Sequence, residues 1–267
     1  MKAMENTGVL KRGEQIDEFK RIGLKVIQDK TRFCFGIDAV LLADFAKVRR
    51  GETVFDLGTG TGIIPLLLAK TTAGAHFTAL ELQAESAEMA RRSVALNNLA
   101  DRIDVVTGDI KNIRSLFAPQ SCNVITVNPP YMPVQRAHAE NSNPQDVSAP
   151  QNLPLPNDAK AIARHELFCT AEDVIAAAAW LLKPQGRLFM IHRPQRLAEL
   201  CALLAKHKLE AKTLRMVQPA ANAAPTMILL EARRNARPDL SVQAPLIVYK
   251  SKGEYSDEVN AIYERIK

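Results

Sequence analysis

A short polar and aromatic motif, Asn128-Pro129-Pro130-Tyr131, directly follows the apolar run at residues 124–127. Two prolines stiffen the turn and remove backbone donors, so the Asn128 amide oxygen and the Pro129 carbonyl oxygen can both accept hydrogen bonds from one ligand nitrogen. Two acceptors on an exocyclic amino or amide nitrogen favour a pyramidal geometry, in which the lone pair can attack an electrophile. A base stacked on Tyr131 would contribute about 1–3 kcal/mol. The motif predicts a site for a planar amino or amide nitrogen, with a plain proline turn as the alternative.

A glycine-rich turn joins an apolar run to a helical pattern at residues 54–63 (VFDLGTGTGI). Gly58, Gly60 and Gly62 would let backbone amides approach a nucleotide-like ligand, because no side chain stands in the way. The third glycine comes one residue earlier than in the dinucleotide fingerprint G-x-G-x-x-G, and Asp56 precedes the turn. Asp56 could hold the ammonium group of the methionine part of S-adenosylmethionine, so the pattern favours this cofactor over NAD. An ordinary strand-turn-helix connection is the alternative.

Two further carboxylates follow the next two strand-like runs. Glu81 lies 19 residues after Gly62, where a carboxylate can accept hydrogen bonds from both ribose hydroxyls of an adenosine-containing cofactor. Asp109 follows the third run, where it could accept a hydrogen bond from the adenine amino group or cap a helix. Together with Asp56 and the glycine turn, these carboxylates form the predicted cofactor site.

Alternating strand-like and helix-like patterns surround these motifs and must position them. The alternation begins at residue 52 and is typical of a mostly parallel sheet with helices on both faces. We therefore expect a doubly wound α/β fold. Strands are predicted at residues 53–57, 77–82, 104–107, 123–127, 186–191, 212–217 and 227–231, and helices at residues 63–70, 84–98, 171–182, 195–207 and 256–266.

We expect the chain to divide into an N-terminal extension at residues 1–50 and a main domain at residues 51–267. In the extension, residues 23–28 and 31–35 predict a small hairpin, and residues 38–46 predict a helix. The main domain should contain a flexible loop at residues 133–158, which include five prolines and few apolar residues. Loops of this length in compact domains are usually functional or disordered.

The composition is typical of a globular protein, with 47% hydrophobic and 24% charged residues. The longest uninterrupted apolar run, at residues 174–182, is far shorter than the roughly 18 residues that cross a bilayer. The N-terminus has no signal-peptide pattern, so we expect a cytoplasmic protein without a membrane partner. No metal is expected, because the four cysteines lack metal-ligand spacing. The oligomeric state is left open.

The net charge of +6 is unevenly distributed along the chain. Residues 181–215 contain eight basic and two acidic residues, so this stretch could attract the phosphates of a nucleic acid. A solvated helix face is the alternative interpretation.

The glycine turn and the NPPY motif together resemble the amino-methyltransferase branch of the class I S-adenosylmethionine-dependent methyltransferases. Over nearly the whole chain, the sequence is similar to the bacterial tRNA(Val) adenine-N6 methyltransferase family, which modifies the adenine just 3′ of the anticodon. The blocks that carry this closer resemblance are residues 33–42 (FCFGIDAVLL), 161–166 (AIARHE), 245–249 (PLIVY) and 255–259 (YSDEV). The loop at residues 133–158 is longer than the family usually carries.

The resemblance implies a Rossmann-like sheet of seven strands, S-adenosylmethionine as cofactor and tRNA as partner. It places Phe35 and Asp38 beside the methionine end of the cofactor, although a core-facing residue and a helix cap are the alternatives. Arg164 and His165 would contact RNA phosphates or lie on the target base, unless they are structural.

The predicted function is N6-methylation of a tRNA adenine beside the anticodon. Asn128, Pro129 and Tyr131 are the predicted catalytic residues; Asn128 also borders the cofactor, and Pro130 and Tyr131 contact the substrate. Because NPPY also suits an amide, a protein glutamine N5-methyltransferase acting on release factors is an alternative, as is an adenine methyltransferase acting on rRNA or DNA. A non-catalytic RNA-binding module is more remote, because it would not need the Asn128 amide.

Overall fold

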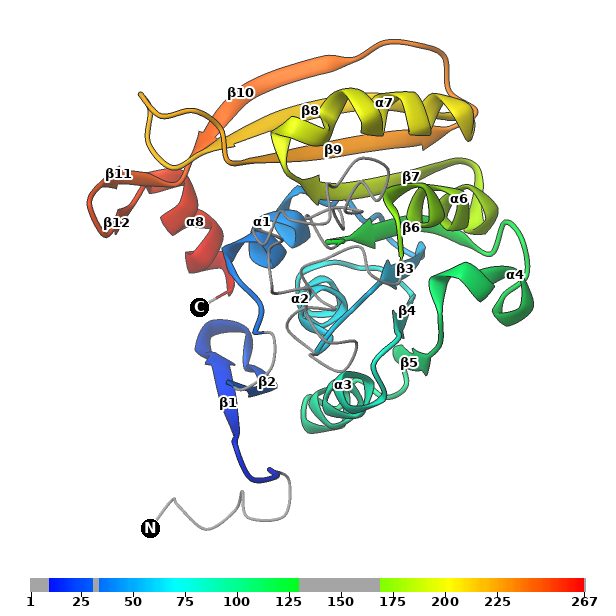
Figure 1. Ribbon diagram of the computed structural model, residues 1–267. Coiled ribbons are helices and arrows are strands. Elements are labelled where there is room, and N and C mark those ends of the chain that lie inside the picture. Colours follow the sequence, from blue (N-terminus) through cyan, green and yellow to red (C-terminus); the bar gives the residue numbers. More distant parts are fainter. Residues whose placement is uncertain (1–9, 31–33, 130–168, 267) are drawn as a thin grey trace, which may run out of the picture.

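The computed structural model describes residues 10–30, 34–129 and 169–266. Its centre is an eight-stranded sheet in the order β10-β8-β9-β7-β6-β3-β4-β5, with helices on both faces (Figure 1). Neighbouring strands are parallel except at β9, which runs antiparallel to β7 and β8. The strands of this sheet are β3 (Thr53–Leu57), β4 (His76–Glu81), β5 (Ile103–Thr107), β6 (Cys122–Val127), β7 (Leu182–His192), β8 (Leu209–Gln218), β9 (Met227–Arg234) and β10 (Ser241–Ile247).

The doubly wound α/β fold predicted from the sequence is confirmed, and seven of its strands match predicted ones. The eighth, β10, was not predicted; it adds to the edge of the sheet beside β8. Residues 241–245 are all exposed. An exposed strand needs no apolar side chains, and the sequence of β10 therefore lacks the apolar pattern of the other strands. Pro245 lies where the register shifts between Gln243 and Leu246, which suits an edge strand because proline cannot donate a ladder hydrogen bond.

Apolar side chains form one core cluster on each face of the sheet. One cluster includes residues of α1 and α2, and the other includes residues of α6 and α7. In α2, every residue from Ile63 to Ala69 is buried, because the helix packs on the sheet and against α1. The helices are α1 (Ile37–Phe45), α2 (Ile63–Thr71), α3 (Ala84–Leu96), α4 (Ile113–Leu116), α6 (Ala171–Leu181), α7 (Leu197–Lys206) and α8 (Asp257–Ile266), with short 3-10 turns η1 (Lys20–Ile22), η2 (Ile110–Asn112) and η3 (Pro194–Arg196).

An N-terminal hairpin is present, but its first strand was not predicted. β2 (Leu24–Asp29) pairs antiparallel with β1 (Glu14–Phe19). Of the partner predicted at residues 31–35, residues 34 and 35 are not in a strand and the others lie outside the described residues. β1 was not predicted because its sequence is mostly polar. The hairpin is held on α3 and its C-cap residue. The Ser93 hydroxyl accepts a hydrogen bond from the Ile27 amide at 2.9 Å, and the Asn97 side-chain oxygen Oδ1 accepts one from the Lys25 amide at 2.9 Å.

The C-terminal segment lies beside the N-terminal hairpin. A small antiparallel pair, β11 (Tyr249–Ser251) and β12 (Glu254–Tyr255), leads into α8, and α8 packs against η1 and lies next to α1 (Figure 1). No helix within the described part of the chain is long and apolar enough to cross a membrane.

Parallel pairing brings the ends of four strands to one edge of the sheet. β3 ends at Leu57, β4 at Glu81, β5 at Thr107 and β6 at Val127, and the register pairs Leu57 with both Leu80 and Val127. In open α/β sheets, ligands bind outside the carboxyl ends of the strands. Asp56 and Glu81 lie in the last two residues of β3 and β4, and Asp109 and Asn128 follow β5 and β6.

Candidate active site

The glycine turn after β3 has the backbone conformation that glycine alone adopts readily. Gly58, Gly60 and Gly62 have φ angles of +72°, +58° and +84°. Among the described residues, a Cβ atom at Gly58 or Gly60 would meet nothing within 4 Å, whereas one at Gly62 would lie 3.2 Å from the Ala90 Cβ atom of α3. The first two glycines therefore border open space, and the third lets α2 pack closely on α3.

Asp56 is a buried carboxylate with an unsatisfied oxygen. Its side chain accepts a hydrogen bond from the Thr126 hydroxyl at 2.6 Å through Oδ1, because the register places Asp56 opposite Thr126. The other oxygen, Oδ2, and the Thr59 hydroxyl have no hydrogen-bond partner among the described residues. Burial raises the pKa of Asp56 to about 6, against the opposing effect of the Thr126 hydrogen bond. A bound cation would favour the ionised form.

Glu81 joins the end of β4 to the glycine turn. Its carboxylate accepts hydrogen bonds from the Gly60 amide at 2.8 Å and the Gln83 amide at 2.9 Å. Burial raises its pKa, while backbone amides act in the opposite direction. Each carboxylate oxygen can accept more than one hydrogen bond, so Glu81 can bind a ligand hydroxyl while it holds the turn.

Asp109 caps the 3-10 turn η2. Its side chain accepts a hydrogen bond from the Lys111 amide at 2.9 Å, which is the capping role considered as an alternative to adenine binding. The residue stands after β5, on the same edge as the glycine turn, and its contact with adenine stays a prediction.

Asn128 is held by a residue near the start of α1. Its Nδ2 atom donates a hydrogen bond to Asp38 Oδ2 at 3.0 Å. Asn128 is half-buried and directly follows β6, whereas Pro129 is buried. Because an ionised carboxylate only accepts hydrogen bonds, the amide nitrogen must face Asp38, and the orientation of the amide oxygen is thereby fixed.

Phe35 lies between the hairpin and α1. Its ring stacks on Phe19 with the centroids 5.9 Å apart, and its backbone amide donates to Gln28 Oε1 at 3.0 Å. These contacts hold the segment that leads to Asp38. They agree with the core-facing alternative for Phe35, and a cofactor contact is not needed to account for its position.

The structure brings Asp38, Asp56, Glu81 and Asn128 to one edge of the sheet, around the glycine turn. The predicted residues Pro130, Tyr131, Arg164 and His165, and the predicted loop at residues 133–158, lie outside the described residues.

Sequence reasoning missed Thr126, which binds the buried carboxylate of Asp56. A signal was available, because Thr126 is the one hydroxyl residue in the otherwise apolar run of residues 124–127. A buried polar side chain in such a strand requires a hydrogen-bond partner.

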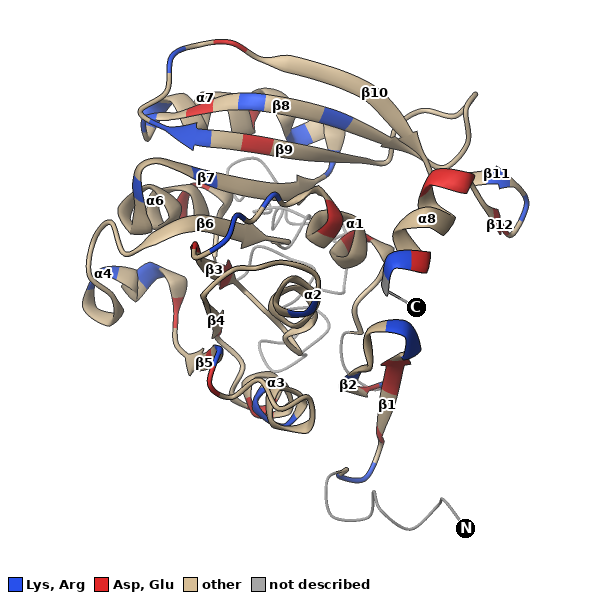
Figure 2. Cartoon of the chain, turned by 180° about the vertical axis from the view of Figure 1, so that it is seen from behind, with Lys and Arg blue, Asp and Glu red and all other residues tan. Residues whose placement is uncertain are grey.

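The basic stretch at residues 181–215 is largely neutralised by ion pairs. Arg187 is buried and pairs with Glu52 at 2.5 Å. Four other basic residues of the stretch also have carboxylate partners: Arg196 with Glu199, Lys206 with Glu172, Lys212 with Asp239 and Arg215 with Glu258. The stretch runs through β7, α7 and β8 rather than over a single face (Figure 2). It is therefore a weak candidate for one continuous phosphate-binding surface.

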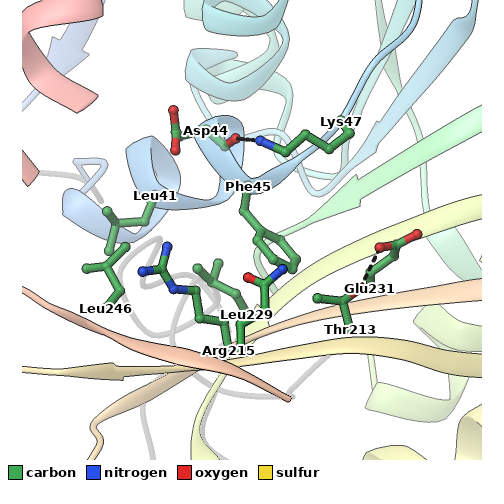
Figure 3. A pocket seen from close by; sticks show the side chains of 10 residues that line it. Leu41, Asp44, Phe45, Lys47, Thr213, Arg215, Leu229, Glu231 and Leu246 are labelled. Atoms are coloured by element: carbon green, nitrogen blue, oxygen red, sulfur yellow. Dashed lines mark hydrogen bonds between the residues drawn. The ribbon is translucent and has the colours of Figure 1, made fainter. Parts of the chain in front are cut away.

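A separate pocket of about 180 Å³ lies between α1 and strands β8, β9 and β10 (Figure 3). Several of its polar groups already have partners: the Thr213 hydroxyl donates to Glu231 at 2.8 Å, and Arg215 pairs with Glu258. The pocket therefore adds no group to the candidate active site. Among the described residues, no cluster of His, Cys, Asp or Glu could hold a metal ion.

The strand order, the antiparallel β9 and the glycine turn at the carboxyl edge define a class I S-adenosylmethionine-dependent methyltransferase. The "Methyltransferase small domain" family matches residues 32–143. The chain also resembles the solved structure of a predicted O-methyltransferase from Agrobacterium tumefaciens, with a TM-score of 0.65, 24% identity and coverage of 85% of this chain and 96% of that one.

The closer family is shown by curated relatives. The chain is 32% identical over 231 residues to a tRNA1(Val) (adenine(37)-N6)-methyltransferase of Porphyromonas gingivalis, which covers 84% of both chains. It is 28% identical to a protein of the same name from Tolumonas auensis, over 88% of this chain and 90% of that one. The chain belongs to the tRNA1(Val) (adenine(37)-N6)-methyltransferase family.

Proposed function

We propose that this chain transfers a methyl group from S-adenosylmethionine to the N6 atom of an adenine in tRNA, the adenine at position 37 that its relatives' names specify. The observation that carries the proposal is the position of Asn128. Asn128 directly follows Val127, which pairs with Leu57 at the end of β3. Because the glycine turn directly follows Leu57, Asn128 lies beside this turn. Its amide is oriented by Asp38 at 3.0 Å.

The residues present fit S-adenosylmethionine. The unsatisfied Asp56 Oδ2 atom and the Thr59 hydroxyl offer buried acceptors for the ammonium group, and open space beside Gly58 and Gly60 leaves room for a ligand. Glu81 would accept hydrogen bonds from the ribose hydroxyls. When bound, the cofactor supplies an electrophilic sulfonium methyl group.

Asn128 and Pro129 would activate the target nitrogen. The Asn128 amide oxygen and the Pro129 carbonyl oxygen each accept one N–H of the adenine amino group. This draws the nitrogen out of conjugation with the ring, so that its lone pair is directed at the methyl carbon. The nitrogen becomes cationic as the new N–C bond forms and the methyl–sulfur bond breaks with S-adenosylhomocysteine as the leaving group, and acceptors already in place stabilise the developing charge. One proton then passes from the nitrogen to water.

The adenine must leave its stack to reach Asn128, at a cost of a few kcal/mol that is smallest for an unpaired base. A tRNA loop offers such bases. Stacking on Tyr131 and contacts from Pro130, Arg164 and His165 stay predictions, as does the location of the protein in the cytoplasm, where tRNA is modified.

One experiment separates the candidate substrates. The protein is incubated with methyl-labelled S-adenosylmethionine and, separately, with unmodified tRNA, a release factor, rRNA and DNA, and the labelled product is digested. We expect label only in tRNA and only as N6-methyladenosine. Label in a glutamine of the release factor, or in rRNA or DNA alone, would replace the proposed substrate. Binding of tRNA without transfer would favour an RNA-binding module.

A further inference from the structure

Three tyrosine rings form a continuous stack at the C-terminal end of the chain. Tyr249 of β11 stacks on Tyr255 of β12 with centroids 5.2 Å apart and planes 17° apart, and Tyr255 stacks on Tyr263 of α8 at 5.4 Å and 11°. Tyr249 is 37% exposed, and no further ring of the described residues stacks on it. The outer end of the stack therefore reaches solvent.

The helix that carries the inner ring of the stack is joined to the helix that carries Asp38. Burial is the main cause that raises the pKa of Tyr263, Tyr255 raises it further, and the Asp38 carboxylate adds a smaller effect in the same direction. Asp38 in turn orients Asn128. Arg265 of α8 pairs with Asp44 of α1 at 2.5 Å, which holds the helix of Tyr263 against the helix of Asp38.

Cationic side chains lie in the β11–β12 turn and on η1, which packs against α8. Lys252 lies in the turn between β11 and β12, and η1 brings Lys20 and Arg21 to α8 (Figure 2). None of these three has a carboxylate partner among the described residues, whereas nearby Lys250 pairs with Glu254 at 2.9 Å. An exposed aromatic face beside unpaired cations suits a base and its phosphates.

We propose that this tyrosine stack is a docking platform for unpaired bases of the tRNA anticodon loop. An unpaired base of the same loop, some nucleotides from the target adenine, stacks on the exposed Tyr249 ring, while Lys252, Lys20 and Arg21 neutralise phosphates of the loop. The two inner rings hold Tyr249 in place, so that little side-chain entropy is lost on binding. The inference rests on the proposed function, since it requires RNA as substrate.

The test compares variants of the full chain with an unmodified tRNA(Val) transcript and its isolated anticodon stem-loop. We expect Tyr249→Ala to raise KM and Kd for both RNAs about tenfold, with a much smaller change in kcat at saturating RNA. Tyr249→Phe retains the aromatic face and should stay within about twofold of the wild type. Affinity for S-adenosylmethionine, measured by calorimetry, should not change in either variant.

Salt dependence tests the cations. Lys252→Gln should reduce the slope of log Kd against log salt by about 0.7, the value for one phosphate contact with a single strand. Lys208→Gln is the matched control: this exposed lysine directly precedes β8, whereas Tyr249 lies near the other end of that strand, where its amide donates a hydrogen bond to the Pro219 carbonyl oxygen. Its replacement should leave the slope unchanged.

Different results overturn different conclusions. If the wild type methylates tRNA but Tyr249→Ala retains the wild-type KM, or if Lys208→Gln alone lowers the slope, the platform is wrong and the proposed function stands. The same holds if Tyr249→Ala weakens S-adenosylmethionine binding as much as RNA binding, because the stack would then be purely structural. If the wild type methylates no tRNA at all, the proposed function itself fails.

Discussion

Asn128 donates a hydrogen bond from Nδ2 to Asp38 Oδ2 at 3.0 Å, across 90 residues of sequence. The bond joins the end of β6 to the first turn of α1 and determines which way the Asn128 amide faces. The reaction proposed here depends on that direction, because the amide oxygen must accept a hydrogen bond from the target nitrogen while the amide nitrogen is held elsewhere. Asp38 is therefore a positioning residue for Asn128.

Replacing Asn128 should affect turnover far more than binding. The amide oxygen acts mainly in the transition state, when the target nitrogen is pyramidal and its hydrogens are more acidic. We expect Asn128→Ala to lower kcat by roughly 10²- to 10³-fold, about 3–4 kcal/mol, while Kd for S-adenosylmethionine and tRNA stays within a few-fold of the wild type. Single-turnover kinetics and calorimetry measure the two effects. A near-normal rate would exclude this mechanism even though the family assignment would stand.

Replacing Asp38 should act through Asn128. We expect Asp38→Ala to lower kcat by roughly tenfold to a hundredfold because the amide loses its fixed orientation, and Asp38→Asn to recover part of the rate because its amide oxygen can still accept from Asn128. The double variant Asp38→Ala/Asn128→Ala should be no slower than Asn128→Ala alone. Fully additive losses would instead mean that Asp38 acts independently, for example by binding the cofactor.

Local sequence signals predicted the centre of the fold closely. Strand β3 was predicted at its observed bounds, and α2 was predicted to within one residue of its end. A buried strand reads as an apolar run, and the turn between the two elements requires the three positive φ angles that Gly58, Gly60 and Gly62 provide. Such features depend on neighbouring residues alone, so the sequence carries them directly.

Local sequence patterns did not indicate several strand pairings and side-chain contacts. The partner of β2 is selected by packing on α3, and β10 has no apolar pattern because it is an exposed edge. At the site, the family resemblance placed Asp38 near the cofactor, but no spacing indicates that it binds Asn128. The stacking of Tyr249 on Tyr255 likewise depends on the β11–β12 pairing. The C-terminal sequence blocks therefore indicated the family but did not predict the tyrosine stack.

Glu81 should contribute to cofactor affinity independently of catalysis. We expect Glu81→Ala to weaken S-adenosylmethionine binding by about 1.5–3 kcal/mol, the usual range for hydrogen bonds to a charged group. Asp101→Ala, at an exposed position after α3, is the control and should bind normally. Calorimetry gives both affinities. Wild-type affinity in Glu81→Ala would remove this residue from the cofactor site and leave it the role of holding the Gly60 amide.

Alanine substitutions should separate the roles of the glycines. Each positive φ angle costs a non-glycine residue about 1–2 kcal/mol, and Gly51→Ala measures this strain alone, because Gly51 has a φ of +78° and open space around it. Gly62→Ala should lower the Tm further, since its Cβ atom would lie 3.2 Å from Ala90. Gly60→Ala should match Gly51→Ala without ligand but lose most of the Tm increase that S-adenosylmethionine gives the wild type. Equal ligand-induced shifts in all three variants would mean that Gly60 does not border the cofactor.

The buried carboxylate of Asp56 should destabilise the ligand-free protein at neutral pH. Its pKa rises from the ordinary 3.8 to about 6 in the folded chain, so the folded state binds the proton more tightly than the unfolded state does. The resulting stabilisation is fully present below pH 3.8 and is lost as the pH rises through about 6. A shift of this size corresponds to roughly 3 kcal/mol. Above pH 7 the ligand-free protein therefore contains a costly buried charge.

Asp56→Asn removes that charge and keeps the hydrogen bond from the Thr126 hydroxyl, because its amide oxygen can replace Oδ1. Its amide nitrogen would face the Thr59 hydroxyl, which lacks a partner among the described residues. Without ligand, we expect the variant to be more stable than the wild type at pH 8, by up to about 3 kcal/mol, and this difference to fall to roughly half at pH 5. Urea unfolding at both pH values measures the difference, with Asp101→Asn as an exposed control that should show none. With S-adenosylmethionine the order should reverse, because the wild-type carboxylate then faces the ammonium group. A variant less stable than the wild type at pH 8 without ligand would show that the folded chain already compensates the charge, and the cofactor would not be needed to do so.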